Sequence, residues 1–328
     1  MTVLLRVRDL RATFVDADGA TRAVDGVSFD LDEGETLGIV GESGAGKSVL
    51  ALSVLRLVEP PGTIAPESVV AYRGTDLLRL REPELRRLRG SEISMVFQDP
   101  AGSLNPVLRI GSQIVETLRA HRPLTRRDAR GRAIELLGLV GMPDPERQID
   151  AYPHELSGGL QQRAMIAMAL SCEPRVLVAD EPTAALDVTV QAQILELLAD
   201  VTRRMGTALL LISHNLGVVA HLADRVAVMY GGQIVEQGPA ARLFADPQHP
   251  YTVALLAAAP LRNEKADRLP AIPGAVPSAV RWPTGCRFHP RCAHAWERCA
   301  AEVPPLLEAG AAHGARCWLV TAPERRRP

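Results

Sequence analysis

The chain has 328 residues, of which 47% are hydrophobic and only 4% aromatic, a globular rather than a disordered composition. This length allows one large α/β domain with a smaller appendage. Lys plus Arg number 37 against 38 for Asp plus Glu, and aromatic residues are scarce, so neither charge nor base stacking predicts a partner such as nucleic acid or a membrane surface.

The first part of the chain alternates short apolar runs with turns. Residues 3–7 and 23–31 are rich in apolar and β-branched side chains and predict two strands, separated by a turn at 16–19. Residues 36–40 predict a short buried strand that leads into a glycine-rich segment, and residues 49–57 then predict a helix. Charges near the start predict no signal peptide, and no apolar run is long enough to predict a membrane-spanning helix.

The central part returns to a strand and helix alternation after a long insertion. Arg, Glu and Leu recur at helical spacing over residues 75–160, which predicts a helical insertion whose arginines form a solvated face. Residues 175–179 and 208–212 predict strands, with a helix over 188–201 between them. This alternation predicts an α/β fold with a mainly parallel sheet and helices on both faces.

The last 80 residues change character because prolines recur there. Their density predicts neither long helices nor central strands, and so a segment with little core of its own. Cys286, Cys292, Cys299 and Cys317 follow in a C-x5-C-x6-C-x17-C pattern, without the C-x2-C pair of zinc ribbons. Four soft ligands suit either Zn²⁺ or an iron–sulfur cluster, and metal binding is favoured over disulfides or simply buried thiols.

Residues 41–48 fit the pattern G-x-x-x-x-G-K-[ST] between a predicted strand and a predicted helix. Glycines allow successive backbone N–H groups to point at one anion. Lys47 is expected to reach the β- and γ-phosphates, and the Ser48 hydroxyl to bind Mg²⁺. A glycine-rich turn without a ligand is the less favoured alternative, since both flanking elements are those that the motif requires.

Two further segments predict parts of the same chemistry. Asp180 and Glu181 end a predicted strand, where Asp180 would hold Mg²⁺ and Glu181 would polarise the attacking water; two surface carboxylates are the alternative. Ser157, Gly158 and Gly159 precede the helical run 160–170 and predict a second phosphate site, with an ordinary helix cap as the alternative. A head-to-tail dimer would bring this second site to the nucleotide of the other subunit.

The order of phosphate loop, Gln98, Leu-Ser-Gly-Gly at 156–159, Asp-Glu and His214 resembles the ABC transporter nucleotide-binding domain over roughly residues 3–245. The resemblance implies a P-loop NTPase (RecA-like) core and an ATPase. It implies that Glu181 is the catalytic base, that Gln98 senses Mg²⁺ and water, and that His214 contacts the γ-phosphate. The residues implied to bind ATP are Phe14, Gly41, Ser43, Gly44, Gly46, Lys47, Ser48, Val49, Gln98, Ser157, Gly158, Gly159, Asp180 and Asp187.

Some of these roles have ordinary structural alternatives. Asp187 resembles the aspartate of the dimer contact but also fits a helix cap, and Phe14 stands where a tyrosine usually stacks on adenine. Asn215 and Ala184 depart from the family's frequent Asp and Ser without removing a catalytic group. The Mg²⁺ ligands implied by the resemblance are Ser48, Gln98 and Asp180.

A finer resemblance, to the oligopeptide and dipeptide importer branch, rests on residues 41–49, 98–106, 185–193, 249–252, 272–274 and 285–292. It implies the D-type of two non-identical ATPase subunits, acting at the cytoplasmic face of the cell (inner) membrane as a peripheral protein. The implied partners are a homologous ATPase in a head-to-tail heterodimer, two membrane-spanning permease subunits and an extracytoplasmic substrate-binding protein, without nucleic acid. It also favours a [4Fe–4S] cluster on the four cysteines, with Zn²⁺ as the alternative.

These patterns together predict three regions. A RecA-like core with an N-terminal β subdomain spans 1–100 and 164–245, a helical subdomain 101–163, and a Pro- and Cys-rich extension 246–328. Uptake of nickel or glycopeptides, and a soluble ABC ATPase without a transport role, are the alternatives to peptide import. A further alternative makes the extension a separate metal-binding interaction module that regulates or docks the complex.

Overall fold

The computed structural model describes residues 2–17, 19–184, 186–258 and 272–326, so part of the predicted extension, 259–271 with Pro260 and Pro270, lies outside the described residues. The chain divides into two compact units. The first contains residues 1–5, 31–35 and 79–212, and the second contains 6–30, 36–78 and 213–328. The three predicted regions, with their boundaries at 100, 163 and 245, stay a prediction.

The first unit contains three parallel strands in the order β9, β8, β7. They are β7 (Ile93–Val96), β8 (Val176–Asp180) and β9 (Ala208–Ile212), and every residue in them is buried. Nearly continuous apolar runs are expected where helices cover both faces of a parallel sheet. The strand β7 corrects the prediction of an all-helical insertion over 75–160. Four residues are too few to interrupt a helical periodicity visibly, but their burial places them in the sheet.

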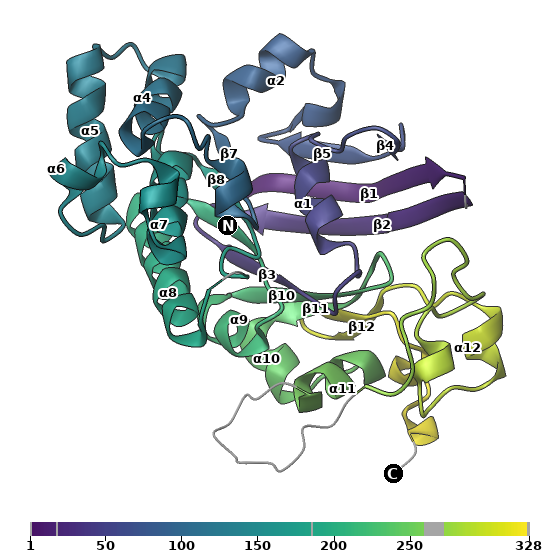
Figure 1. The fold of residues 1–328 in the computed structure, drawn as a ribbon. Coiled ribbons are helices and arrows are strands. Elements are labelled where there is room, and N and C mark those ends of the chain that lie inside the picture. The colour runs from purple at the N-terminus through teal and green to yellow at the C-terminus, as the bar shows by residue number, and fades with distance from the viewer. Residues whose placement is uncertain (1, 18, 185, 259–271, 327–328) are drawn as a thin grey trace. The chain divides into compact units, whose positions relative to one another are not determined.

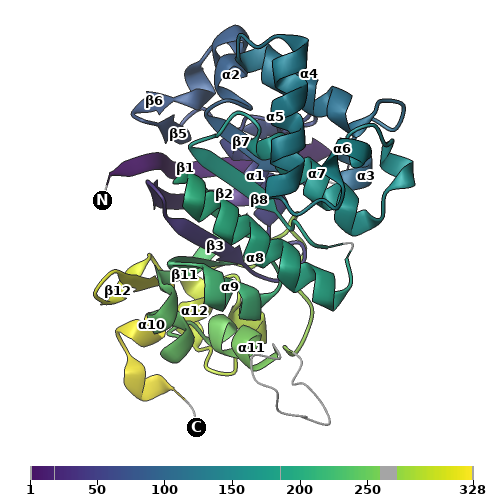
Figure 2. The same ribbon diagram turned by 90° about the vertical axis from the view of Figure 1, so that its left-hand side faces the viewer.

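Helices make up most of the remainder of the first unit, as predicted for its Arg- and Leu-rich stretch. They are α2 (Glu82–Leu88), α3 (Pro100–Ser103), α4 (Ile110–His121), α5 (Arg126–Leu139), α6 (Pro145–Gln148), α7 (Gly158–Leu170) and α8 (Val188–Met205). Figure 1 and Figure 2 show α4, α5 and α7 packed side by side. The arginines lie on solvated faces as predicted: Arg130 pairs with Asp150 at 2.7 Å, both side chains being exposed.

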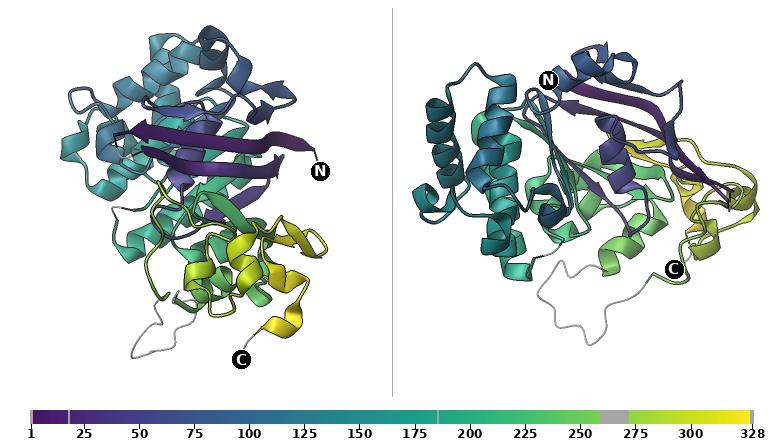
Figure 3. Two further views of the ribbon diagram at one scale, coloured as in Figure 1. Left: turned by 90° about the vertical axis from the view of Figure 1, so that its right-hand side faces the viewer. Right: turned by 45° about the horizontal axis from the view of Figure 1, so that its top comes forward.

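The second unit has an antiparallel sheet near the N-terminus, in the order β2, β1, β5, β6, with β4 also paired to β1. Its strands are β1 (Val3–Asp16), β2 (Gly19–Asp32), β4 (Gly62–Ile64), β5 (Val69–Tyr72) and β6 (Thr75–Asp76), with the ends of β1 and β2 assigned to the first unit. Figure 3 shows β1 and β2 as a long ribbon. Both strands extend beyond their predicted bounds because polar and apolar residues continue to alternate.

The second unit also contains five strands in the order β12, β13, β11, β10, β3, with β3 parallel to β10. They are β3 (Thr36–Val40), β10 (Arg225–Tyr230), β11 (Gln233–Pro239), β12 (Leu307–Gly310) and β13 (His313–Ala315). The extension therefore adds two strands, and β13 is paired on both sides. This corrects the prediction that the extension has no central strand: residues 306–322 contain no proline, so their N–H groups can enter a ladder.

The helices of the second unit are α1 (Lys47–Val54), α9 (Leu216–Leu222), α10 (Ala240–Ala245), α11 (Pro250–Ala258) and α12 (Glu297–Ala301). α1 begins two residues before its predicted start, directly in the glycine-rich segment. α11 begins at Pro250. Proline is tolerated there because an N–H group in the first turn of a helix has no intrahelical acceptor, so its absence costs no hydrogen bond. No helix in the described part of the chain is long and apolar enough to cross a bilayer.

Candidate nucleotide site and thiol pocket

The phosphate loop (residues 41–48) connects the buried strand β3 to helix α1 in the second unit. Gly44 and Gly46 have φ angles of 78° and 97°, in the region that favours glycine. A Cβ on Gly46 would lie 2.0 Å from the Ala23 carbonyl oxygen, so only glycine fits there. The buried Lys47 folds back over the loop, where its Nζ donates to the carbonyls of Gly41 (3.0 Å) and Glu42 (3.1 Å). The loop thus has the curled backbone that an anion cradle requires.

Phe14 and His214 also lie in the second unit. The half-buried Phe14 of β1 is opposite Gly62 of β4, and a Cβ on Gly62 would lie 2.6 Å from the Phe14 ring. His214 is exposed immediately before α9, where the side chain of Asn215 accepts a hydrogen bond from the Val218 N–H (3.3 Å). Asn215, noted as a departure from the family pattern, is therefore a helix cap.

The first unit brings together the predicted catalytic base and the predicted sensor. Asp180 is 4% exposed at the end of β8, and the following residue, Glu181, has a φ of 43°, which is uncommon for a residue other than glycine. The Gln98 side-chain amide lies 3.4 Å from a Glu181 carboxylate oxygen. Parallel pairing of β7 with β8 produces this proximity, since Val96 is opposite Ala179. Polar groups thus gather at the carboxyl ends of these strands, where open α/β sheets bind ligands.

The signature segment (residues 156–159) precedes α7 in the first unit. Ser157 occupies the cap position with extended backbone angles, but its side chain makes no capping hydrogen bond within the described residues. Gly158 and Gly159 pack closely against α8 and the turn before it. A Cβ on Gly158 would lie 3.4 Å from the Leu186 side chain, and a Cβ on Gly159 would lie 3.1 Å from the Val190 side chain. An ordinary side-chain cap therefore does not account for Ser157.

Asp187 is a helix cap in this structure. Its carboxylate accepts a hydrogen bond from the Val190 N–H (3.0 Å) at the start of α8. This is the ordinary alternative named for it, and its role in a dimer contact stays a prediction. Ser43, Gly41 and Val49, the other predicted ATP-binding residues, belong to the phosphate loop or to the first turn of α1.

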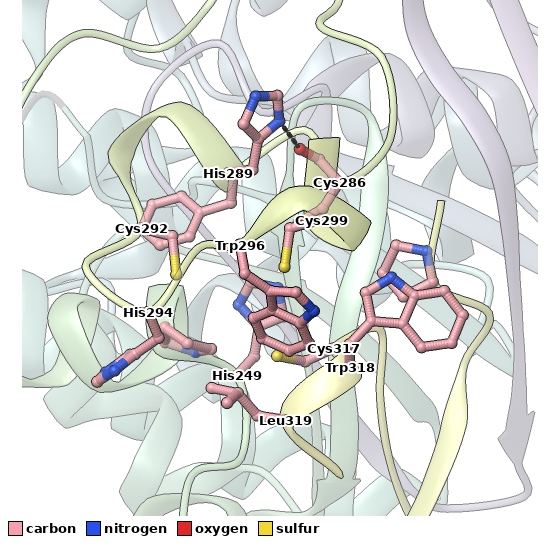
Figure 4. A pocket seen from close by; sticks show the side chains of 13 residues that line it. His249, Cys286, His289, Cys292, His294, Trp296, Cys299, Cys317, Trp318 and Leu319 are labelled. Carbon is pink, nitrogen blue, oxygen red and sulfur yellow. Dashed lines mark hydrogen bonds between the residues drawn. The ribbon is translucent and has the colours of Figure 1, made fainter. Parts of the chain in front are cut away.

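The four C-terminal cysteines line one small pocket in the second unit, together with His249, Phe288, Trp296 and Trp318 (Figure 4). The segment between Cys286 and Cys292 is a tight turn, in which the His289 ring nitrogen contacts the Cys286 carbonyl at 2.9 Å. None of the four forms a disulfide with another described residue, and the Cys286 N–H donates to the Cys299 carbonyl (2.8 Å). The four predicted metal ligands thus lie around one pocket.

The thiol pocket is apolar, which affects protonation. Burial raises the pKa of Cys286 to about 11 and that of Cys317 to about 12, so that both are neutral thiols when nothing is bound. Burial likewise lowers the pKa of His249 to about 3, and its Nδ1 accepts a hydrogen bond from the Tyr251 N–H (3.0 Å). A metal group bound by these cysteines would displace their protons.

The positions of the four thiols can be compared with what a metal site requires. Ligation of a single Zn²⁺ holds four sulfurs about 2.3 Å from one point. Among the described residues, no three His, Cys, Asp or Glu side chains converge in a way that could hold one metal ion. Within the described residues the structure thus shows no metal site, and both metal groups stay predictions for the four cysteines.

Comparison with known proteins identifies the family. The family model described as ABC transporter matches residues 24–184, and the one described as oligopeptide/dipeptide transporter, C-terminal region, matches residues 235–299. A probable peptide ABC transporter ATP-binding protein of Sinorhizobium fredii is 51% identical over 96% of this chain and 95% of its own length. The chain belongs to the ABC transporter ATP-binding proteins.

Other members of this family are similarly close. The oligopeptide transport ATP-binding protein OppD of Bacillus subtilis is 47% identical, over 98% of this chain and 90% of its own length. The dipeptide transport ATP-binding protein DppD of Escherichia coli is 48% identical, over 92% of each. The predicted resemblance to the oligopeptide and dipeptide branch is thereby confirmed, and the family is one of ATPases.

Solved structures confirm the fold class. A dimeric ATP-binding cassette in a post-hydrolysis state with ADP and Pi has a TM-score of 0.65 and 26% identity, over 72% of this chain and 99% of its own. The protein cbiO1 of Clostridium perfringens, part of an ABC transporter complex, has a TM-score of 0.62 and 28% identity, over 75% of this chain and 92% of its own. The P-loop NTPase core predicted from residues 41–48 is the observed one.

Sequence reasoning missed three residues around the phosphate loop. Glu42 was an unassigned position of the motif, but it forms an ion pair with Arg291 and its N–H donates to the Tyr251 hydroxyl. Tyr251 is completely buried and Arg291 nearly so. The signal available in the sequence was an arginine directly before a cysteine. Its partner, Glu42, lies 249 residues away in sequence, so the pairing itself could not be predicted.

Proposed function

We propose that this chain is the ATP-hydrolysing subunit of an ABC importer for di- and oligopeptides. The observation that carries the peptide assignment is the match of residues 235–299 to the C-terminal region of oligopeptide/dipeptide transporters, together with relatives that transport peptides and match nearly the full chain. The phosphate loop, the Gln98–Glu181 pair and the signature segment support the ATPase assignment. Import of nickel or glycopeptides is the alternative that the experiment below must separate.

In the proposed site, Lys47 and the backbone N–H groups of the phosphate loop hold the β- and γ-phosphates. Ser48, Gln98 and Asp180 would bind Mg²⁺, which neutralises phosphate charge when present. Glu181 orients and deprotonates the attacking water, and His214 hydrogen-bonds the γ-phosphate as charge develops there. Phe14 stacks on the adenine. The other proposed ATP contacts follow the phosphate-loop motif: Gly41, Ser43, Gly44, Gly46 and Val49.

The signature residues Ser157, Gly158 and Gly159 are proposed to complete the site of a second, homologous ATPase subunit in a head-to-tail heterodimer, with Asp187 at the contact. Two observations support this role: the Ser157 hydroxyl makes no capping hydrogen bond within the described residues, and the start of α7 is exposed. The dimeric state of a similar solved cassette supports it further. Closure of the dimer on two ATP molecules would supply the work of transport.

The remaining partners are proposed from the same assignment. Two permease subunits would span the membrane and a substrate-binding protein would deliver peptide, while this chain acts peripherally at the cytoplasmic face of the cell (inner) membrane, without nucleic acid. Val107 and Leu108, which follow Gln98, are 75% and 37% exposed and offer an apolar contact for a permease. This exposed pair supports docking of a permease on the first unit.

The four cysteines of the extension are proposed to hold a [4Fe–4S] cluster, with Zn²⁺ as the alternative. The lining of one pocket by all four thiols supports a shared metal group, and the resemblance to the peptide-importer branch favours the cluster. Its role would be structural, because bonds to four cysteines fasten a segment with little core of its own.

Peptide import can be tested by deleting the gene and measuring uptake of labelled di- and tripeptides, nickel and a glycopeptide in the same cells. We expect loss of peptide uptake alone, restored by the unchanged chain but not by Glu181→Gln. Loss of nickel or glycopeptide uptake with normal peptide uptake would contradict the substrate class. Restoration by Glu181→Gln would contradict the catalytic assignment.

A further inference from the structure

Arg291 lies in the cysteine segment but its guanidinium group is directed at the phosphate loop. Its two terminal nitrogens donate to the two carboxylate oxygens of Glu42, at 2.8 and 3.1 Å. Paired donors and acceptors of this kind form a bidentate ion pair, which fixes orientation as well as distance. The Arg291 side chain is 4% exposed and that of Glu42 27%, so solvent weakens this pair less than a surface ion pair.

The position of Arg291 is fixed by contacts on its other sides. Its Nε donates to the Pro273 carbonyl (2.8 Å), and a terminal nitrogen donates to the Ile272 carbonyl (3.3 Å). The guanidinium also lies 5.8 Å from the centre of the Tyr230 ring and 5.9 Å from that of Phe288, at cation–π distance. A lysine could not reproduce this set of directed donors.

Glu42 is also held through its backbone. Its N–H donates to the hydroxyl of the buried Tyr251 (2.8 Å), and its carbonyl accepts from the Lys47 ammonium (3.1 Å). One residue of the loop is thus bound by the extension through its side chain and its amide, while its carbonyl orients the phosphate-binding lysine. Movement of Arg291 or Tyr251 would be transmitted to Lys47 through Glu42.

The same elements border the thiol pocket. Cys292 follows Arg291 directly in sequence, and Cys286 closes the other end of the same turn. Phe288, between them, packs against Tyr251 with ring centres 5.4 Å apart, and its ring also lines the pocket. Ligation of Cys286 and Cys292 would therefore fix the turn that carries Arg291.

We infer that Arg291 and Tyr251 are positioning residues for the phosphate loop, through which the state of the thiol pocket sets the affinity for nucleotide. The inference rests on the proposed ATP site and on the proposed metal group in the pocket. The extension then regulates nucleotide affinity, and the metal group in its thiol pocket also stabilises the extension itself. By thermodynamic linkage, nucleotide must stabilise the loaded pocket by the same factor that loading strengthens nucleotide binding.

The first experiment measures the dissociation constant of Mg-ADP by calorimetry on the full chain. We expect Arg291→Gln and Glu42→Gln each to weaken binding about tenfold or more, the scale of losing a hydrogen bond to a charged group. The double variant should be no weaker than either single one, because both remove the same pair. Arg281→Gln, an exposed arginine of the same extension, is the matched control and should bind like the unchanged chain.

Two conservative variants keep the test independent of misfolding. Tyr251→Phe removes only the hydroxyl that accepts from the Glu42 N–H, and Arg291→Lys keeps the charge but not the paired donors. Both should fold and weaken Mg-ADP binding by about threefold to tenfold, less than or equal to Arg291→Gln. Unchanged affinity in Tyr251→Phe and Glu42→Gln would overturn the positioning role. No binding by the unchanged chain would instead overturn the proposed ATP site, and this inference with it.

The second experiment compares Mg-ADP affinity before and after a chelator removes iron from protein purified without oxygen. We expect removal to weaken binding in the unchanged chain by about the factor that Arg291→Gln causes, with little further loss in Arg291→Gln itself. Equal affinity in the two states, or a chain that carries no metal when purified, would overturn the link between the pocket and the loop. The Mg-ADP comparison among the variants would still decide the positioning role.

Discussion

The side-chain amide of Gln98 lies 3.4 Å from a carboxylate oxygen of Glu181. The two residues follow neighbouring parallel strands, β7 and β8, whose carboxyl ends meet at one edge. An amide donor at this distance can orient a carboxylate toward a water molecule. The contact places the proposed catalytic glutamate beside the residue proposed to sense Mg²⁺ and water.

Glu181→Gln is expected to keep nucleotide binding and to lower the steady-state ATPase rate by about 10² to 10⁴, the usual contribution of a general base. The substitution preserves shape and removes only the proton acceptor. Release of phosphate by the assembled transporter measures the rate, and retention of labelled ATP measures binding. Gln98→Ala is the comparison: it should lower the rate less, since the base itself remains. A Glu181→Gln variant that turns over normally would exclude Glu181 as the base.

Gly46→Ala is expected to abolish ATP binding and to destabilise the fold by about 1–3 kcal/mol or more. The new Cβ would meet the Ala23 carbonyl oxygen at 2.0 Å, and the φ of 97° disfavours alanine. Gly44→Ala is the matched control, because its φ is also positive but nothing lies within 4 Å of the added Cβ. Thermal unfolding of both variants gives the comparison, and equal losses of stability would contradict the steric argument. Mg-ADP titration of Gly46→Ala checks the loss of binding.

Asp30 should make stability depend on pH in the acid range. Burial acts to raise the pKa of its carboxyl, but hydrogen bonds and charge from Arg8 and Arg6, at 2.7 and 3.2 Å, outweigh this and hold it below the ordinary value. A lowered folded-state pKa stabilises the fold above the ordinary pKa near 4, and the stabilisation is lost as pH falls through the folded-state value.

The measurement is the free energy of unfolding from urea titrations between pH 7 and pH 3, for the unchanged chain and for Asp30→Asn. We expect the gap between the two proteins to be widest at pH 7 and to close as the pH falls below about 4. A gap that is constant with pH would show that the aspartate contributes packing rather than charge.

Removal of one pocket thiol should remove the metal. Cys292→Ser is expected to lose bound iron and sulfide and to lower the melting temperature, because one of four ligands and the closure of the turn are lost together. Cys172→Ser is the matched control: this thiol is buried in the first unit, outside the thiol pocket, so metal content should be unchanged. Zinc at one ion per chain, without iron, would exclude the cluster.

Asp187→Ala is expected to destabilise the first unit by about 1 kcal/mol, since it removes the cap of α8. Asp187→Asn keeps a capping acceptor and should restore most of this stability. Chemical denaturation measures both variants. If Asp187 also contributes to the dimer, both variants should weaken ATP-dependent dimerisation, which sedimentation with Glu181→Gln as background would detect.

Much of the site was predictable because its motifs are local. The phosphate loop carries its own glycines and lysine within eight residues, and glycine permits the positive φ angles observed at Gly44 and Gly46. The strand β7 was missed because four residues are too few to show a periodicity of their own. The strand β13 was missed because proline density was averaged over the whole extension, although residues 306–322 lack proline.

The sequence by itself determined that this protein belongs to a family of ATPases, since its short motifs occur in the order typical of that family. The same motifs predict which groups would face phosphate, Mg²⁺ and water. Only the tertiary structure decided what surrounds that chemistry. The pairing of Arg291 with Glu42, and the meeting of four thiols in one pocket, join residues far apart in the chain. Contacts of this kind depend on burial and on the packing of several elements at once, which leave no local pattern to read.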